Sequence, residues 1–202
     1  MLKRSSDLGI SAGLIVLTLP VTAVALATMA VDMLVRRADR GRFVYRERRV
    51  SRGREFDVLK FRTVRDDALR GMRADEHARM LEADPANLTW AGWRLLKPWY
   101  LDELPQLLNV LRGDMSLVDP RPWPPEMVAR QVDRGVDYRL HVRAGWTGPA
   151  QVSKGKDVSF EELDLEYVER CRRSSGLQLL RYDLGILRRT VATLARGEGL
   201  RY

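Results

Sequence analysis

The chain opens with a long apolar segment. From Leu8 to Val35 the only charged residue is Asp32, and most of the other residues are aliphatic. These 28 residues exceed the ~20 helical residues that cross a bilayer. Pro20 lies near the middle of the segment, where a proline removes a helical hydrogen bond and favours a bend. At ~1.5 Å per residue, neither arm beside the bend reaches across a hydrocarbon core of ~30 Å alone.

Basic residues flank both ends of this segment. Lys3 and Arg4 precede it, and four arginines follow it, namely Arg36, Arg37, Arg40 and Arg42. Because basic flanks stay in the cytoplasm, a bent helix that enters the membrane and returns to the same side satisfies both ends. We therefore predict a re-entrant helical hairpin that bends at Pro20. A helix that crosses the membrane without a bend leaves only one basic flank in the cytoplasm. The C-terminal cluster has more basic residues, so it would still keep the rest of the chain in the cytoplasm.

A cleavable signal peptide is the alternative interpretation of the first 35 residues. Lys3-Arg4, the apolar stretch and the small residues of Ala25-Leu26-Ala27 imitate its three regions. The apolar region is too long for one, however, and arginine-rich sequence directly after a cleavage site opposes export. We therefore assign residues 1–37 to a membrane hairpin with basic flanks. Residues 38–202 are assigned to a monotopic, membrane-associated domain at the cytoplasmic face of the inner membrane.

Beyond this segment the pattern changes to shorter elements. Residues 43–49 and 56–62 alternate like strands on either side of a turn at Ser51-Arg52-Gly53. Residues 145–155 are interpreted as loop. Helical signals occur at 74–83, 104–111, 125–134, 160–173 and 177–195. The pattern predicts an α+β fold, mostly helical with one short antiparallel hairpin.

Composition narrows the chemistry that this fold can carry. The chain has 35 Lys+Arg against 27 Asp+Glu, a net charge of +8, which favours an anionic partner such as nucleic acid, phospholipid headgroups or a phosphorylated substrate. One cysteine excludes an internal disulfide and a cysteine zinc site, and two histidines exclude a histidine-rich metal site. Glycine-rich phosphate loops of the usual patterns are absent from the sequence. Catalysis would therefore rest on carboxylates and arginines.

Two further groups of residues suggest a membrane surface. Residues 36–54 contain nine arginines, which form either a solvated face or a collar against anionic headgroups. Trp90, Trp93 and Trp99 are interpreted as core or as an interfacial aromatic belt, and the belt is favoured.

An adjacent acid pair, Asp102-Glu103, stands at the start of an apolar helical run that Gly113 ends. In the simplest interpretation the acids complement the helix dipole, and Pro105 is tolerated because early N–H groups lack intrahelical partners. The stretch alone does not decide whether the pair has a further role.

Three motifs in order supply the context. KFRTV (60–64), LDELPQLLNVLRGDMSLVDPRP (101–122) and GWTGPAQVS (145–153) follow the basic-flanked apolar segment. Together they resemble the small form of the bacterial sugar transferases, which are monotopic polyprenyl-phosphate phosphoglycosyl transferases. The resemblance covers nearly the whole chain, and residues 101–122 are its most specific part.

The resemblance implies a transferase in the first membrane step of glycan or exopolysaccharide assembly. Such an enzyme moves a sugar-1-phosphate from a nucleoside-diphosphate sugar to a polyprenyl phosphate and releases a nucleoside monophosphate. The expected donor is a UDP-sugar, and the expected acceptor is undecaprenyl phosphate. The resemblance makes Asp102 the nucleophile of a covalent aspartyl intermediate. Glu103 then shares the binding of Mg²⁺ and the handling of protons. The residues agree with this chemistry, since a carboxylate can attack a phosphoryl centre and form an acyl phosphate. Both acids reach one metal ion only at an irregular helix terminus, which Pro105 favours. The expected partners are the two substrates and membrane lipids, and nucleic acid is not expected. The sequence leaves undecided whether the protein forms a homodimer.

Basic residues inside the motifs are candidates for binding substrate phosphates, namely Lys60, Arg62 and Arg121. Asp119 departs from the glycine that is usual in this family before Pro-Arg-Pro, and its carboxylate would repel a diphosphate unless it points away or binds metal. Leu19 replaces the serine that is usual before the hairpin proline, although Thr18 offers a hydroxyl one position earlier. A catalytically inactive family member and a membrane-tethered basic protein that binds lipid or nucleic acid without catalysis remain the alternatives.

Overall fold

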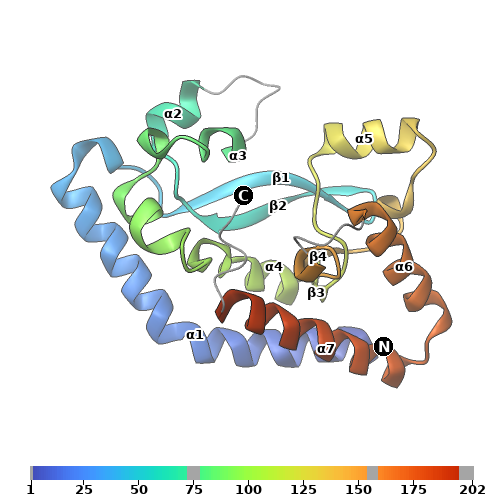
Figure 1. Cartoon of the computed structure of the whole chain (residues 1–202). Helices are drawn as coiled ribbons and strands as arrows, with labels where there is room; N and C mark the ends of the chain where they lie inside the picture. The colour runs from blue at the N-terminus through green and yellow to red at the C-terminus, as the bar shows by residue number, and fades with distance from the viewer. Residues whose placement is uncertain (1, 72–77, 154–158, 196–202) are drawn as a thin grey trace. The chain divides into compact units, whose positions relative to one another are not determined.

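A computed structural model describes residues 2–71, 78–153 and 159–195 of the chain (Figure 1). Helices predominate, so the predicted class, a mostly helical α+β fold with a short antiparallel hairpin, is confirmed. The helices and strands in chain order are α1 (Leu2–Val35), β1 (Val44–Ser51), β2 (Arg54–Phe61), α2 (Asp66–Gly71), α3 (Ala78–Leu81), α4 (Gln106–Arg112), β3 (Met115–Val118), α5 (Pro125–Asp133), β4 (Ala144–Thr147), α6 (Phe160–Arg173) and α7 (Gly176–Ala195). A π-helical turn occupies Gly92–Leu96 and a 3-10 turn Leu101–Glu103.

The predicted hairpin is formed by β1 and β2. The two residues of its tight turn, Arg52 and Gly53, both have positive φ, at 51° and 68°. That geometry matches the twist of the two strands, which explains why glycine is favoured in the turn. Both strands lie within one or two residues of the ranges expected from the alternation.

A second, parallel pair of strands was missed by the sequence analysis. Strand β4 pairs with β3 in the register Met115↔Ala144, Ser116↔Gly145 and Val118↔Thr147. The prediction of loop from residue 145 onward is therefore wrong for the first residues of that range. Each strand has four largely buried residues, and such short strands show no alternation of apolar and polar positions. Gly145 is required because a Cβ there would collide with the Asp119 backbone.

The later helices agree closely with their predicted ranges. Helix α6 begins after Ser159, whose hydroxyl caps the helix by accepting a hydrogen bond from the Glu162 N–H at 3.4 Å. Gly113 ends α4 with a φ of 96°, as the sequence suggested. The helix predicted at 74–83 lies partly outside the described residues, and α3 accounts for Ala78–Leu81.

The chain forms two compact units. The first comprises the residues up to Leu14, Glu47–Val58 and the chain from Gln106 onward, with its core at β3, β4 and the helices after them. The second comprises Ile15–Arg46 and Leu59–Pro105. Its core joins α1 to the approach of the acid pair through the buried residues Ala25, Met29, Phe61, Ala91 and Leu96, with Leu101 and Leu104 packed against them.

Helix α1 is one continuous helix that contains Pro20. It is long and apolar enough to cross a membrane, with a mean hydropathy of 2.3 over its best 18-residue window, of which 11% is buried. Exposed aliphatic side chains continue along it, including Leu17 at 73% and Leu34 at 75%. The apolar helix is therefore confirmed. The re-entrant hairpin is not confirmed by this helix alone, and the domain boundary at residue 37 stays a prediction.

Candidate active site

The acid pair lies on irregular backbone in the second unit. Asp102 and Glu103 end a 3-10 turn that precedes α4. Tyr100, directly before this turn, has a left-handed backbone with φ 52° and ψ 24°, which is uncommon for a residue other than glycine. Strained backbone of this kind persists only where its surroundings enforce it, and it gathers at functional sites. The pair thus stands at the irregular helix terminus that joint metal binding requires.

Asp102 is buried, with 5% of its surface exposed. Burial raises the pKa of its carboxyl group above the ordinary value, and the neighbouring carboxylate of Glu103 raises it further. The ammonium groups of Lys97 and Lys60 lower it. A nucleophilic carboxylate must be ionised, so cations beside Asp102 are what this site needs in order to react.

Lys97 is a residue that the sequence analysis did not single out. It forms an ion pair with Glu82, whose other carboxylate oxygen lies 3.4 Å from the Thr63 hydroxyl. Its only signal in the sequence is a lysine within an apolar stretch, five positions before Asp102. Lys60, which was predicted to bind phosphate, also lies close enough to Asp102 to act on its pKa. The structure therefore brings Lys60 and the acid pair together.

The donor set suits Mg²⁺. Two carboxylates supply hard oxygen ligands, and placing the second beside the buried Asp102 is unfavourable unless a cation lies nearby. Within residues 2–71, 78–153 and 159–195, no group of three or more His, Cys, Asp or Glu could hold a metal ion. Mg²⁺, however, is usually held by one or two carboxylates together with substrate phosphates and water. The acid pair therefore fits an ion that binds with a diphosphate.

Arg62 occupies a different position from the one its motif suggested. It is 2% exposed, and its guanidinium donates to the carbonyl oxygens of Asp39 at 2.5 Å, Arg42 at 2.8 Å and Val64 at 3.0 Å. The Asp66 carboxylate lies 3.6 Å from its Nε. In this arrangement Arg62 holds together the backbone before β1 and after β2.

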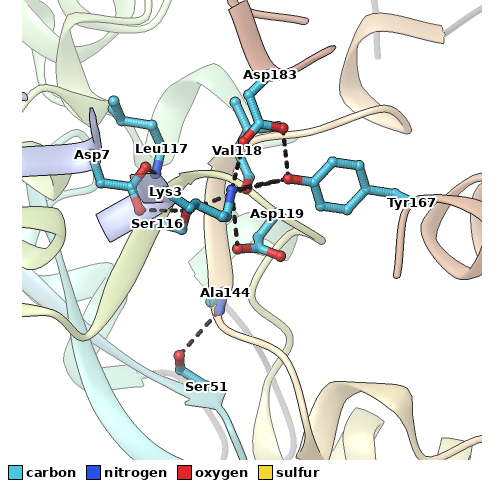
Figure 2. A network of polar contacts seen from close by, with 10 residues as sticks. All are labelled: Lys3, Asp7, Ser51, Ser116, Leu117, Val118, Asp119, Ala144, Tyr167 and Asp183. Atoms are coloured by element: carbon cyan, nitrogen blue, oxygen red, sulfur yellow. Dashed lines mark hydrogen bonds and ion pairs between the residues drawn. The ribbon is translucent and has the colours of Figure 1, made fainter. Parts of the chain in front are cut away.

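Asp119 and Arg121 belong to the first unit, unlike the acid pair. Arg121 is partly buried, and its carbonyl oxygen accepts a hydrogen bond from the Arg139 guanidinium. Asp119 is buried with its carboxylate 3.7 Å from the Lys3 ammonium (Figure 2). Burial, together with the negative charge of Asp183, raises the pKa of Asp119 to about 7, and Lys3 lowers it. The Asp119 carboxylate is therefore engaged with the start of α1.

Lys3 is the centre of a buried polar network in the first unit (Figure 2). Its ammonium donates to Asp183 at 2.8 Å, to the Val118 carbonyl at 2.6 Å and to the Tyr167 hydroxyl at 3.0 Å. One turn later in α1, Asp7 accepts hydrogen bonds from the Ser116 hydroxyl at 2.8 Å and the Leu117 N–H at 3.2 Å. The charges at the start of α1 thus bind protein groups as well as providing a basic flank.

The other end of α1 carries a similar contact in the second unit. Asp32 is 3% exposed, accepts a hydrogen bond from the Ala91 N–H and pairs with Arg36 at 2.9 Å. A charged residue inside an apolar helix is costly unless it is paired, and that cost is itself a signal of a partner. The tryptophans nearby are exposed, Trp90 at 41%, Trp93 at 45% and Trp99 at 72%, so they are not core.

Comparison with known proteins decides the family. The family described as "Bacterial sugar transferase" matches residues 1–197. The chain belongs to the bacterial sugar transferase family. The UDP-galactose-lipid carrier transferase of Erwinia amylovora is 35% identical to it over 98% of this chain and 41% of its own length. The exopolysaccharide production protein ExoY of Sinorhizobium fredii is 32% identical over 98% of this chain and 87% of its own length.

A third relative of this sugar transferase is the undecaprenyl-phosphate galactose phosphotransferase of Salmonella typhimurium. It is 37% identical over 80% of this chain and 35% of its own length. The chain therefore spans about two fifths of the Erwinia protein and about a third of the Salmonella protein, but most of the Sinorhizobium protein.

Proposed function

We propose that this protein transfers a sugar-1-phosphate from a nucleoside-diphosphate sugar to undecaprenyl phosphate, through a covalent intermediate on Asp102. The observation that carries the proposal is an acid pair whose first member, Asp102, is buried close to Lys60 and Lys97, on strained backbone in a member of the sugar transferase family. The names of two relatives support the substrates, since one includes UDP-galactose and the other undecaprenyl phosphate and galactose.

Two displacements at phosphorus make up the proposed reaction. A carboxylate oxygen of Asp102 attacks the sugar-bearing phosphorus, the bond to the second phosphate breaks, and its electron pair leaves with the nucleoside monophosphate. The sugar phosphate then forms a mixed anhydride with Asp102. An oxygen of polyprenyl phosphate attacks the same phosphorus and returns the carboxylate. Lys60 and Lys97 oppose the rise in the Asp102 pKa and so favour the ionised form that the first step requires.

Glu103 and Asp102 would together hold Mg²⁺. When bound, the ion would neutralise the charge of the diphosphate. Lys60 and Arg121 are proposed to bind substrate phosphates. Arg62 keeps that proposed role beside the backbone contacts described above, since it stands two residues after Lys60 in the same motif.

We also propose that α1 is re-entrant and that both of its ends face the cytoplasm. The start of the helix bonds to Ser116, Val118 and Asp183, and its end bonds to Ala91. All of these residues follow α1 in the chain. The basic residues before the apolar segment, Lys3 and Arg4, and the arginines after it favour the cytoplasmic side for both ends. Pro20 and the back-bonded hydroxyl of Thr18, which donates to the Ile15 carbonyl at 3.3 Å, favour a bend.

The proposed activity is tested by supplying undecaprenyl phosphate in detergent with a panel of nucleotide sugars that begins with UDP-galactose. We expect Mg²⁺-dependent release of nucleoside monophosphate that requires the lipid for repeated turnover. A lipid- or nucleic-acid-binding protein without catalysis would release none with any sugar. An inactive family member would give the same null result while still binding the nucleotide sugar.

A further inference from the structure

A hollow with a volume of about 880 Å³ opens in the second unit, apart from the residues of the acid pair. Its walls come from the start of β1, from α2 and from Arg62. Four of the residues that line it are arginines, and one is an acid; the charged set is Arg42, Arg46, Arg62, Arg70 and Asp66. The volume lies in the range of small-molecule sites in proteins. It therefore has room for a phosphate together with the group that carries it.

Among the described residues that line this hollow, basic side chains outnumber acidic ones. Asp66 is shared between two of the arginines, at 3.6 Å from Arg62 Nε and 3.8 Å from Arg70. Arg62 donates to backbone carbonyls from Nε and from both terminal nitrogens, which leaves it fewer donors than the other arginines. In the part of the chain that the structure describes, no carboxylate pairs with the exposed side chains of Arg42 and Arg46. Within the described residues, Arg42 and Arg46 therefore offer their guanidinium groups to a ligand, and Arg70 adds a third whose ion pair with Asp66 is long, at 3.8 Å.

Concentration of one sign of charge in a concave surface raises the local potential and attracts a counter-ion. Guanidinium groups bind phosphate through paired, charge-assisted hydrogen bonds, which a lysine point charge does not reproduce. Val44 and Leu69 add apolar surface to the same walls. A phosphate with an attached organic group matches both the charge and the lining.

We propose that this hollow is a second phosphate-binding site, which takes the phosphate group of a membrane lipid or of a nucleotide through Arg42, Arg46 and Arg70. The site goes beyond the proposed function, because it needs no chemistry at Asp102. Arg42 follows the apolar helix by seven residues in sequence, which makes a lipid headgroup one natural source of the phosphate. A soluble nucleotide is the other source with the same chemistry.

The test compares the full chain with a double variant, Arg42→Gln with Arg46→Gln. The matched control is Arg48→Gln with Arg54→Gln, which removes the same charge from exposed positions of the same hairpin outside the hollow. One arm measures binding to phosphatidylcholine vesicles that contain phosphatidylglycerol or undecaprenyl phosphate. The other arm titrates UMP by calorimetry. Neither arm requires turnover, so a failed transferase assay leaves this test intact.

We expect the double variant to bind about fivefold or more weakly in one arm, since a basic residue near anionic lipid contributes about 1 kcal/mol. Loss in the vesicle arm assigns the site to lipid, and loss in the UMP arm assigns it to nucleotide. Asp66→Asn keeps the shape and removes the competing carboxylate, so it should tighten binding in the same arm. A purely structural role for these residues cannot produce tighter binding. Unchanged binding of the double variant in both arms, or an equal loss in the control, would overturn the proposal.

Discussion

The Asp32 carboxylate accepts a hydrogen bond of 2.9 Å from the Ala91 N–H. This contact fixes the last part of α1 to the segment that leads into the acid pair. It lies beside the apolar cluster that includes Ala25, Met29 and Leu96. The helix that sequence analysis assigns to the membrane is therefore also part of the core beneath the candidate active site.

Asp32→Leu should destabilise the protein. The substitution leaves the Ala91 N–H buried without an acceptor, which costs about 1–3 kcal/mol. For a chain of this size, that should lower the melting temperature by roughly 5 °C. Thermal unfolding in detergent checks the result, with the exposed Asp67→Leu as the control. An increase in melting temperature would mean that Asp32 faces lipid, where leucine is preferred.

Labelling of single cysteines tests the topology of α1. In a Cys171→Ser background, Ser5→Cys and Ala38→Cys are both exposed positions beside the ends of the apolar segment. The neighbouring Gly41 is unsuitable for a cysteine substitution, because a Cβ at this position would meet the Asp66 carboxylate. We expect an impermeant thiol reagent to label neither site in intact cells and both after permeabilisation. Labelling of the Ser5 site from outside would establish a straight span instead.

Arg121→Lys should lower kcat/KM by about tenfold or more while the protein keeps its melting temperature. The charge remains, but a forked donor becomes a single point donor to the phosphate. Arg62→Lys should lower the melting temperature as well, because lysine cannot reach all three carbonyl oxygens that the guanidinium bridges. Wild-type kinetics in both variants would remove these two residues from phosphate binding.

Asp119 should make stability depend on pH. Its pKa is raised in the folded protein to about 7, so the folded state holds this proton more tightly than the unfolded chain. The resulting stabilisation is complete below about pH 4 and is lost as the pH rises through about 7. Asp119→Asn removes the titrating group. The melting temperature of the variant relative to wild type should therefore rise by at least about 3 °C between pH 5 and pH 8.

The exposed Asp133→Asn serves as the control for that measurement. Its melting temperature should follow that of the wild type across the same range. A difference between Asp119→Asn and wild type that stays constant with pH would show that Asp119 does not titrate in this interval. The Lys3 ammonium would then hold it fully ionised throughout.

Local patterns predicted the long elements well. Alternation and the turn at Ser51-Arg52-Gly53 were enough for the hairpin, and helical periodicity was enough for α6. The parallel pair β3–β4 was beyond such signals, because strands of four buried residues have no periodicity and are paired by contacts far apart in the sequence.

The sequence identified the acid pair because its motif is long and specific. It did not identify all of the residues that surround the pair in the folded structure. Lys97 acts on Asp102 through space, and no pattern in the sequence marks it. Lys3 and Asp32 were interpreted from charge alone, as a membrane flank and an isolated acid. Their partners, Asp183 and Ala91, lie far along the chain and become evident only in the folded structure.

Nucleotide release without a lipid acceptor is the sharpest test of the covalent route through Asp102. Wild-type enzyme given a sugar-labelled nucleotide sugar should release about one nucleoside monophosphate per molecule and retain the labelled sugar phosphate. Asp102→Asn should show neither release nor label in a folded protein, although asparagine begins a helix about as well as aspartate. Asp133→Asn, matched in chemistry, should behave as wild type. An absent burst, no retained label and an active Asp102→Asn enzyme would contradict the covalent route and leave the acid pair as the start of a helix.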